Sequence, residues 1–244
     1  MSAYNEFKKK PSFDWTTMPE LVELATQLDA EKELLGCDTI FVRLSSRSPK
    51  DAVAYRPDFT QVFETTLKSI EEEEASQGYD TGKVNRAILA LYIACTQTLA
   101  SKSGKDAVDL LTKSERIQGD LENHLNEGKE AMNFIVREFI QFLPEFELRV
   151  FVNNGKLTAI SQYNHMNYSK KLFDNVDTIT KLMEAYITNE LIPSLKMNSF
   201  VLDTILISQT PDQGHTTNLK PYVIEVNPFG EMTGPALFSW EEDR

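Results

Sequence analysis

The sequence has few of the residues that form cross-links or bind soft metals. It contains two cysteines, Cys37 and Cys95, and three histidines, His124, His165 and His215, which are scattered over 244 residues. Two cysteines give no disulfide framework, and the five residues together do not have the ligand spacing of a zinc site. We therefore expect neither a disulfide scaffold nor a zinc centre.

Long apolar runs are also missing. No run approaches the roughly 20 apolar residues that a membrane-spanning helix needs. The first eleven residues, MSAYNEFKKKP, lack the apolar core of a signal peptide. These two absences predict a soluble cytoplasmic protein with no membrane partner.

Basic residues are outnumbered by acidic ones, 25 to 37, so the formal net charge is −12. General attraction to nucleic acid is disfavoured at this charge, and we expect no nucleic-acid partner. A local basic site for a small anion remains compatible, because distant charges are screened by salt. The content of hydrophobic residues, 41%, is ordinary for a soluble globular protein, and the length suits one large domain or two lobes around a cleft.

The stretch from Phe200 to Glu231 is the most informative. It reads FVLDTILI, a polar connection, and YVIEVNPFGE, which predicts two β-strands forming a long hairpin. Because side chains alternate along a strand, Asp203 is expected on the face of Val201 and Ile205. By the same alternation, Glu225 and Asn227 are expected on the face of Val223. If these faces coincide, three oxygen-bearing side chains converge.

Two carboxylates in apolar strands are costly to bury, and they also repel each other. A divalent cation removes both penalties, and carboxylate and amide oxygens suit a hard ion such as Mg²⁺. The alternative is that Asp203 and Glu225 face solvent on the outer side of a half-exposed sheet. The sharp exit that Asn-Pro-Phe-Gly makes after the strand favours the metal site.

A cationic segment lies upstream, at residues 38–52. The alternation around Ile40, Val42 and Leu44 predicts a strand that ends in a polar loop. Arg43 on this strand and two further cations in the loop, Arg47 and Lys50, lie within eight residues of an acidic chain. The loop is either a solvated turn or a site that grips phosphate.

The remaining pattern alternates helices and strands, so the fold class is α+β. Helical periodicity covers residues 11–36, most of 59–127 with a break near Gly119, and 169–197. A strand-rich block begins at Met132, and Asn-Gly at 154–155 predicts a tight hairpin. Within this hairpin, Arg149 has two open roles: pairing with Glu147, or reaching across the sheet to a phosphate.

Six segments in collinear order resemble the cell division cycle protein 123 family (D123), whose members are ATP-grasp proteins. The resemblance covers about 200 residues, and NPFG followed by LFSWEE is its most specific part. The segments are FVRLSSRSPKDA (41–52), DLLTKSERIQGDL (109–121), FIVREFI (134–140), ELRVFVNNGKLTAISQYN (147–164), FVLD (200–203) and VIEVNPFGEMTGPALFSWEE (223–242).

The resemblance implies an ATP-grasp fold, in which two lobes with antiparallel sheets enclose a nucleotide cleft, with ATP and Mg²⁺ as cofactors. It implies a helical segment at 1–37 and an ATP-grasp domain at 38–244, with a smaller lobe at about 38–130 and a metal-bearing lobe at about 131–244. The residues that it implies are Asp203, Glu225 and Asn227 for the metal, Arg43, Lys50, Arg149 and Asn227 for the phosphates, and Arg137, Glu138 and Phe139 for the adenine.

Two of these positions depart from the family pattern. Arg43 lies where the family usually carries a lysine, which replaces a point charge by a planar fork. Glu225 lies where the family typically carries an aspartate, and its longer side chain is still able to ligate a metal.

Two functions from different classes follow from the resemblance. The first is an ATP-binding assembly chaperone that binds the gamma subunit of eukaryotic translation initiation factor 2. The second is a divergent ATP-grasp ligase or phosphotransferase that activates a carboxylate or another acceptor. The latter needs no nucleophilic side chain, because positioning and charge neutralisation carry such phosphoryl transfers. In both, Asp203→Asn is expected to weaken Mg-ATP binding far more than fold stability, since it relieves carboxylate repulsion.

Overall fold

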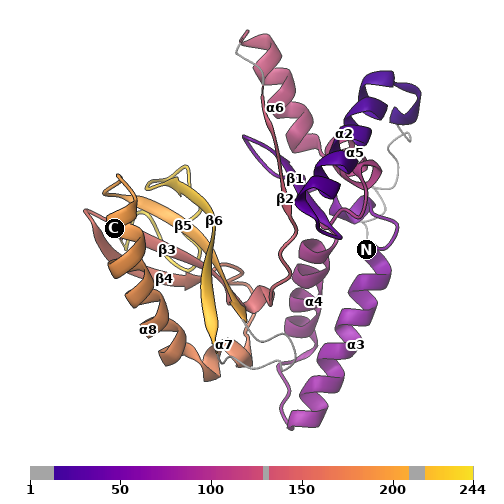
Figure 1. Ribbon diagram of the computed structural model, residues 1–244. Helices are drawn as coiled ribbons and strands as arrows, with labels where there is room; N and C mark the ends of the chain where they lie inside the picture. Colours follow the sequence, from indigo (N-terminus) through magenta and orange to yellow (C-terminus); the bar gives the residue numbers. More distant parts are fainter. Residues whose placement is uncertain (1–13, 129–131, 209–217, 244) are drawn as a thin grey trace. The chain divides into compact units, whose positions relative to one another are not determined.

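A computed structural model describes residues 14–128, 132–208 and 218–243 (Figure 1). The chain is α+β, as predicted, and its described strands form two separate antiparallel sheets. Contacts between residues divide it into two compact units, each built from two segments. Unit 1 comprises residues up to Thr60 together with Cys95–Phe139, and unit 2 comprises Gln61–Ala94 together with the residues from Ile140 onward. The expected lobes at 38–130 and 131–244 stay a prediction, because compactness does not define a nucleotide-binding lobe.

Unit 1 begins with a short 3₁₀ turn, Trp15–Thr17, and helix α2, Pro19–Leu35. Proline at the first position of α2 suits the helix start, where its missing N–H has no helical partner. Gly36 ends the helix in the left-handed conformation at φ 66°, a backbone that favours glycine. The helical segment predicted over residues 11–36 therefore contains a helix at Pro19–Leu35, which ends at the predicted limit.

The two-stranded sheet of unit 1 pairs β1, Ile40–Leu44, with β2, Phe134–Glu138. The sequence predicted both strands, but grouped β2 with the hairpin that follows it rather than with β1. Helices α5, Gly104–Lys113, and α6, Glu115–Asn126, complete the unit. Apolar side chains of α2, β1 and α5 form one buried core, with Leu28, Ile40, Leu44 and Val108 among its members.

The sequence predicted a helix break near Gly119, but the break between α5 and α6 lies at Ser114. Ser114 has an extended backbone, and its hydroxyl accepts a hydrogen bond from the backbone N–H of Ile117 at 3.1 Å. This is an N-cap, which satisfies a free N–H at the start of α6. Gly119 lies inside α6, so the predicted break at the glycine is wrong. The serine marks the start of the second helix.

Unit 2 contains α3, Phe59–Gln77, whose first residues belong to unit 1, the larger part of α4, Lys83–Gln97, and a four-stranded sheet in the order β4-β3-β5-β6. Strands β3, Glu147–Asn153, and β4, Lys156–Gln162, are joined by Asn154 and Gly155, at φ 51° and 70°. Positive φ at both turn residues is the geometry that Asn-Gly favours, so the predicted hairpin is confirmed.

One face of this sheet packs against α8, Val176–Tyr186 (Figure 1). The periodic segment 169–197 is not one helix: α7, Lys170–Asp174, precedes α8, a π-helical turn follows at Ile187–Leu191, and α9 covers Ile192–Ser194. Pro193 has no N–H to continue the helical bonding pattern, which accounts for the widened turn before it. Phe200, Leu202, Ile179 and Met183 lie at the centre of the core between the sheet and α8.

The predicted hairpin of β5, Phe200–Ser208, and β6, Leu219–Pro228, is confirmed, although its connection lies outside the described residues. The pairing aligns Asp203 with Glu225 and then shifts, so that Thr204 pairs with Val223. This bulge adds one residue on β6 and reverses the alternation there. Val223 consequently packs against the α8 core, and the predicted shared face of Val223 and Glu225 is wrong.

None of the helices in the described part of the chain combines the length and apolar character that a membrane crossing needs.

Candidate functional site

Asp203 lies at the centre of the sheet face that points away from α8. It is 3% exposed, on the central strand β5, and both of its oxygens bind the guanidinium of Arg149 on β3. Arg149 Nε donates to Oδ1 at 2.8 Å, and Nη2 donates to Oδ2 at 2.9 Å. Of the two roles left open for Arg149, the pairing with Glu147 is not the contact seen, since Arg149 pairs with Asp203. Its role at a phosphate stays a prediction. The bidentate pair compensates the cost of burying the carboxylate.

The register of β5 and β6 brings the other two predicted ligands to the same face. Glu225 is the direct partner of Asp203 across the strands, and Asn227 is the partner of Val201. Asn227 Nδ2 donates to Asp203 Oδ2 at 3.2 Å. Two carboxylates and one amide thus lie together, as the alternation predicted, while their role as metal ligands stays a prediction.

A buried tyrosine–glutamate pair extends the polar face beyond Arg149. Glu147, two residues before Arg149 on the same face of β3, is 6% exposed and accepts a short hydrogen bond from the hydroxyl of Tyr92 on α4. Burial, followed by the charge of Glu147, raises the pKa of Tyr92 far above its usual value. Tyr92 therefore stays a hydrogen-bond donor at any physiological pH.

Arg149 is held by more than its pair with Asp203. Its guanidinium lies over the ring of Tyr163, 4.8 Å from the centroid, and Nη1 donates to the carbonyl of Gly234 at 2.6 Å. Burial acts to lower the pKa of Arg149, but the hydrogen bonds and charge of Asp203 outweigh it and raise that pKa above its usual value. The guanidinium is a permanent cation on this face.

The segment that carries Gly234, residues 229–243, is the C-terminal segment, and it packs on the same sheet face. The ring of Phe151 on β3 meets the rings of Phe238 and Trp240 edge-on, at centroid distances of 5.5 and 5.9 Å. Trp240 Nε1 donates to the carbonyl of Thr233 at 2.6 Å. The motif that gave the resemblance its most specific part therefore lies against the polar face, next to Arg149.

The donor set of this face fits a divalent cation. Asp203, Glu225 and Asn227 supply hard oxygens from adjacent strands, which is the ligand chemistry of Mg²⁺. No three His, Cys, Asp or Glu side chains gather into a metal site among the residues that the structure describes, so such an ion would depend on the amide and on waters or a ligand. Softer metals do not fit a face made of oxygens.

The predicted cations of unit 1 lie on and after β1. Arg43 is half-buried, and its Nε donates to the carbonyl of Leu44 at 3.0 Å. Lys50 is exposed in the following turn. Arg47 binds Asp120 of α6, with Nε and Oδ2 2.6 Å apart. Arg47 is thus held by an acidic residue of α6, and the phosphate role of Arg43 and Lys50 stays a prediction.

The predicted adenine connector forms the end of β2. Arg137 places its guanidinium 4.6 Å from the ring centroid of Phe41, and Glu138 pairs with Ile40 in the register of the sheet. The backbone N–H of Phe139 donates to the carbonyl of Thr39 at 3.0 Å. These contacts fix the backbone of the connector, and they leave its role in adenine binding untested.

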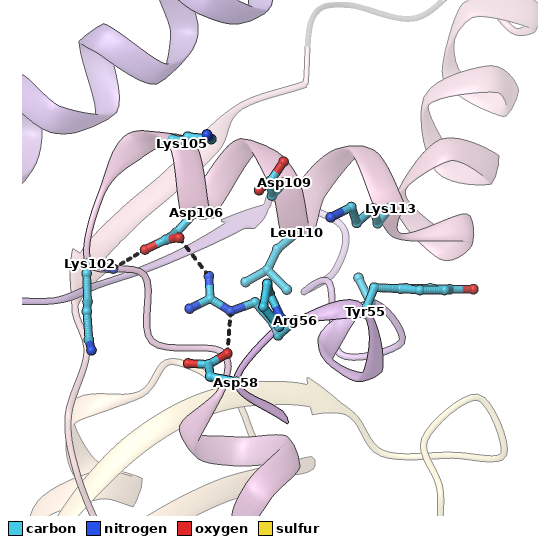
Figure 2. A pocket seen from close by; sticks show the side chains of 11 residues that line it. Tyr55, Arg56, Asp58, Lys102, Lys105, Asp106, Asp109, Leu110 and Lys113 are labelled. Atoms are coloured by element: carbon cyan, nitrogen blue, oxygen red, sulfur yellow. Dashed lines mark hydrogen bonds and ion pairs between the residues drawn. The ribbon is translucent and has the colours of Figure 1, made fainter. Parts of the chain in front are cut away.

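A cavity of about 420 Å³ in unit 1 has mixed charge (Figure 2). At its centre Arg56 donates to Asp58 at 3.3 Å and lies 3.1 Å from Asp106 of α5. Its side chain is 8% exposed, so the two carboxylates neutralise a buried cation and link the start of α3 to α5. We interpret this ion pair as a structural contact within unit 1.

Several residues of the polar face were missed by the sequence analysis. Tyr92 lies in a segment for which the sequence predicted only a helix, because its partner Glu147 lies 55 residues away and nothing local marks the pair. Gly234 stood inside a recognised motif, but its contact with Arg149 spans 85 residues. A glycine next to a conformationally restricting proline, as in Gly234-Pro235, was the available signal of a close backbone approach.

Comparisons with known proteins identify the family of this chain. The model of the D123 family matches residues 89–243. The chain is 29% identical over 191 residues to the translation initiation factor eIF2 assembly protein of Kluyveromyces lactis, covering 74% of this chain and 50% of that protein. It is 32% identical over 141 residues to the cell division cycle protein 123 of Candida glabrata, covering 54% of this chain and 37% of that protein. The chain thus spans at most half the length of these two relatives.

A solved structure has the same fold. The C-terminally truncated Cdc123 from Schizosaccharomyces pombe superimposes with a TM-score of 0.64 at 18% identity, over 99% of this chain and 79% of that one. At this identity the likeness concerns the fold alone. Taken with the family model, which covers more than half of the residues, it leads to one conclusion: the chain belongs to the D123 family.

Proposed function

We propose that the chain binds Mg-ATP as an ATP-grasp protein and acts as an assembly factor for translation initiation factor 2, through that factor's gamma subunit. The observation that carries the proposal is the face of Asp203, Glu225 and Asn227, with Arg149 beside it, inside a D123 chain. Relatives with this family's sequence are named eIF2 assembly proteins, which supports the partner.

In this proposal each predicted residue has a chemical role. Asp203, Glu225 and Asn227 would hold Mg²⁺, which supplies charge neutralisation at the phosphates. Arg149 would contribute positive charge to the phosphates. Arg43 and Lys50 would keep the phosphate roles, and Arg137 to Phe139 the adenine contacts, that the family resemblance implies. Hard oxygen donors and guanidinium forks are the groups that recognise a magnesium–phosphate ligand, which supports the assignment.

Calorimetric titration of the purified protein with ATP tests the nucleotide part of the proposal. We expect binding with Mg²⁺ that is lost when EDTA removes the metal. Absence of binding in both conditions would remove the ATP-grasp function. A parallel assay for ADP shows whether bound ATP is consumed. Binding without ADP formation supports an assembly factor. ADP release that depends on an added acceptor makes the chain a ligase or phosphotransferase.

Binding to the isolated gamma subunit of translation initiation factor 2 tests the partner. We expect complex formation in size-exclusion chromatography, and a larger yield of assembled factor when Mg-ATP is present. The alpha subunit of the same factor is the control. Equal retention of both subunits, or of neither, would contradict the proposed partner.

A further inference from the structure

Arg149 links two parts of unit 2 that are far apart in the sequence. Its Nε and Nη2 bind the two oxygens of Asp203, and its Nη1 binds the carbonyl of Gly234 in the C-terminal segment. A guanidinium is planar and rigid, so its three nitrogens move together. Any change in the contact of Arg149 with Asp203 therefore changes its contact with Gly234.

Both oxygens of Asp203 are covered by cationic or amide donors. Oδ1 accepts from Arg149, and Oδ2 accepts from Arg149 and from Asn227. A divalent cation on Asp203 would meet the positive charge of Arg149 on the same two atoms. Like charges at this distance repel, so binding of a metal weakens the contact of the guanidinium with these oxygens.

Of the three hydrogen bonds that Arg149 donates, the one to the carbonyl of Gly234 is the weakest. Its acceptor is a neutral carbonyl, whereas the Asp203 bonds join opposite charges. The surroundings of Gly234 are also tightly packed against Arg149. A Cβ atom built on Gly234 lies 3.3 Å from Arg149 Nη1, while one on Gly230 meets nothing within 4 Å. Moving the guanidinium therefore affects the C-terminal segment at Gly234 first.

We propose that Arg149 is a resident counter-ion of Asp203, which a divalent cation displaces, and that this displacement detaches the C-terminal segment at Gly234. The inference rests on the proposed binding of Mg-ATP and adds a consequence to it. Binding of the cation to the polar face then changes the position of residues 229–243. Two side chains of this segment, Met232 and Leu237, are 96% and 62% exposed. The exposed side of the C-terminal segment thus differs between the metal-free and the metal-bound protein.

The two tryptophans make the coupling measurable. Trp15 lies in unit 1 and Trp240 in the C-terminal segment, and the indole N–H of Trp240 donates to Thr233. In a ¹⁵N-labelled sample the indole resonances are assigned with a Trp15→Phe variant. We expect Mg-ATP, but not ATP with EDTA, to shift the Trp240 resonance. If calorimetry records Mg-ATP binding while the Trp240 resonance stays in place, the coupling is wrong and the proposed function stands; if no binding occurs, both are overturned.

A pair of glycine variants separates the coupling from a direct effect of bound ATP on the indole. Gly234→Ala crowds Nη1, and we expect it to move the Trp240 resonance toward its loaded position without any ligand and to tighten Mg-ATP binding roughly twofold or more. Gly230→Ala, in the same segment but in open space, should leave both unchanged. Identical behaviour of the two variants would overturn the inference.

Discussion

At the scale of single residues, the pair of Asp203 and Arg149 decides how the polar face responds to mutation. The sequence predicted that Asp203→Asn relieves repulsion and weakens Mg-ATP binding far more than fold stability. The structure changes the stability part, because the carboxylate is already paired with a guanidinium that is 13% exposed. We expect Asp203→Asn to lower the free energy of unfolding by about 1–3 kcal/mol, since a neutral amide replaces one partner of a buried pair.

Urea unfolding followed by circular dichroism measures this loss. Asp174→Asn is the control, because Asp174 pairs with Lys170 on an exposed helical turn and its removal should leave the unfolding midpoint unchanged. Calorimetry on the same Asp203 variant should show that Mg-ATP affinity falls as well. An Asp203 variant as stable as the wild type would mean that Arg149 finds another partner.

Glu145 is a second residue whose environment predicts a measurable effect, this time on pH dependence. It is 5% exposed, and its Oε2 has no hydrogen-bond partner among the residues that the structure describes. Burial raises the pKa of its carboxyl above the usual 4.5. Between pH 4.5 and the raised pKa, the folded protein keeps a proton that the unfolded chain has released. Stability from this group is therefore lost as pH rises through that window.

The variant Glu145→Gln should remove this pH dependence and stabilise the protein at neutral pH, on the order of 1 kcal/mol. The free energy of unfolding measured in urea at a series of pH values from roughly 4 to 8 is the test. Glu241→Gln, at an exposed position, is the control and should keep the wild-type slope. A Glu145 variant with an unchanged slope would show that the carboxyl finds solvent or a partner.

At the scale of elements, the contact between α2 and α5 depends on one glycine. A Cβ atom on Gly104, the first residue of α5, would lie 1.8 Å from the carbonyl oxygen of Ala25 in the middle of α2. Backbone atoms cannot yield as a flexible side chain does, so the two helices have to separate. We expect Gly104→Ala to destabilise the protein by about 3 kcal/mol or more.

Gly119 provides the opposite case within the same unit. It lies inside α6, and a Cβ there meets nothing within 4 Å, so Gly119→Ala should raise stability by about 1 kcal/mol through helix propensity. Thermal unfolding of both variants is sufficient to compare them. A Gly104 variant that melts like the wild type would contradict the close packing of α2 on α5.

The elements themselves were predicted where the signal is local. Asn154-Gly155 fixed the β3–β4 hairpin, and the alternation in β5 and β6 placed Asp203 and Glu225 on facing strands. The sequence did not reveal the break at Ser114 or the bulge opposite Thr204. Both depend on which of several competing hydrogen-bond patterns wins, and that choice is made by packing against the rest of the unit.

At the scale of the whole molecule, the sequence predicted an α+β chain and the residues of the polar face, but not what holds them. The partners of Arg149 and Glu147 come from segments 54 to 85 residues away, and no periodicity marks contacts at such separations. The resemblance supplied roles for Arg43, Lys50 and Asp203, and these roles remain predictions. Strand pairing over long sequence separations was likewise beyond local patterns, since β2 pairs with β1 rather than with its neighbour in the sequence, β3.

The pairing of β1 with β2 has a consequence for folding during synthesis on the ribosome. Ile40 pairs with Glu138, so the first strand emerges long before its partner exists. At translation rates of about 5–20 residues per second, the delay is roughly 5–20 seconds. Throughout that interval the nascent chain displays Ile40, Val42 and Leu44, which are all buried in the finished molecule. The sheet of β1 and β2 is therefore the part of the fold that would gain most from a chaperone that covers β1 during synthesis.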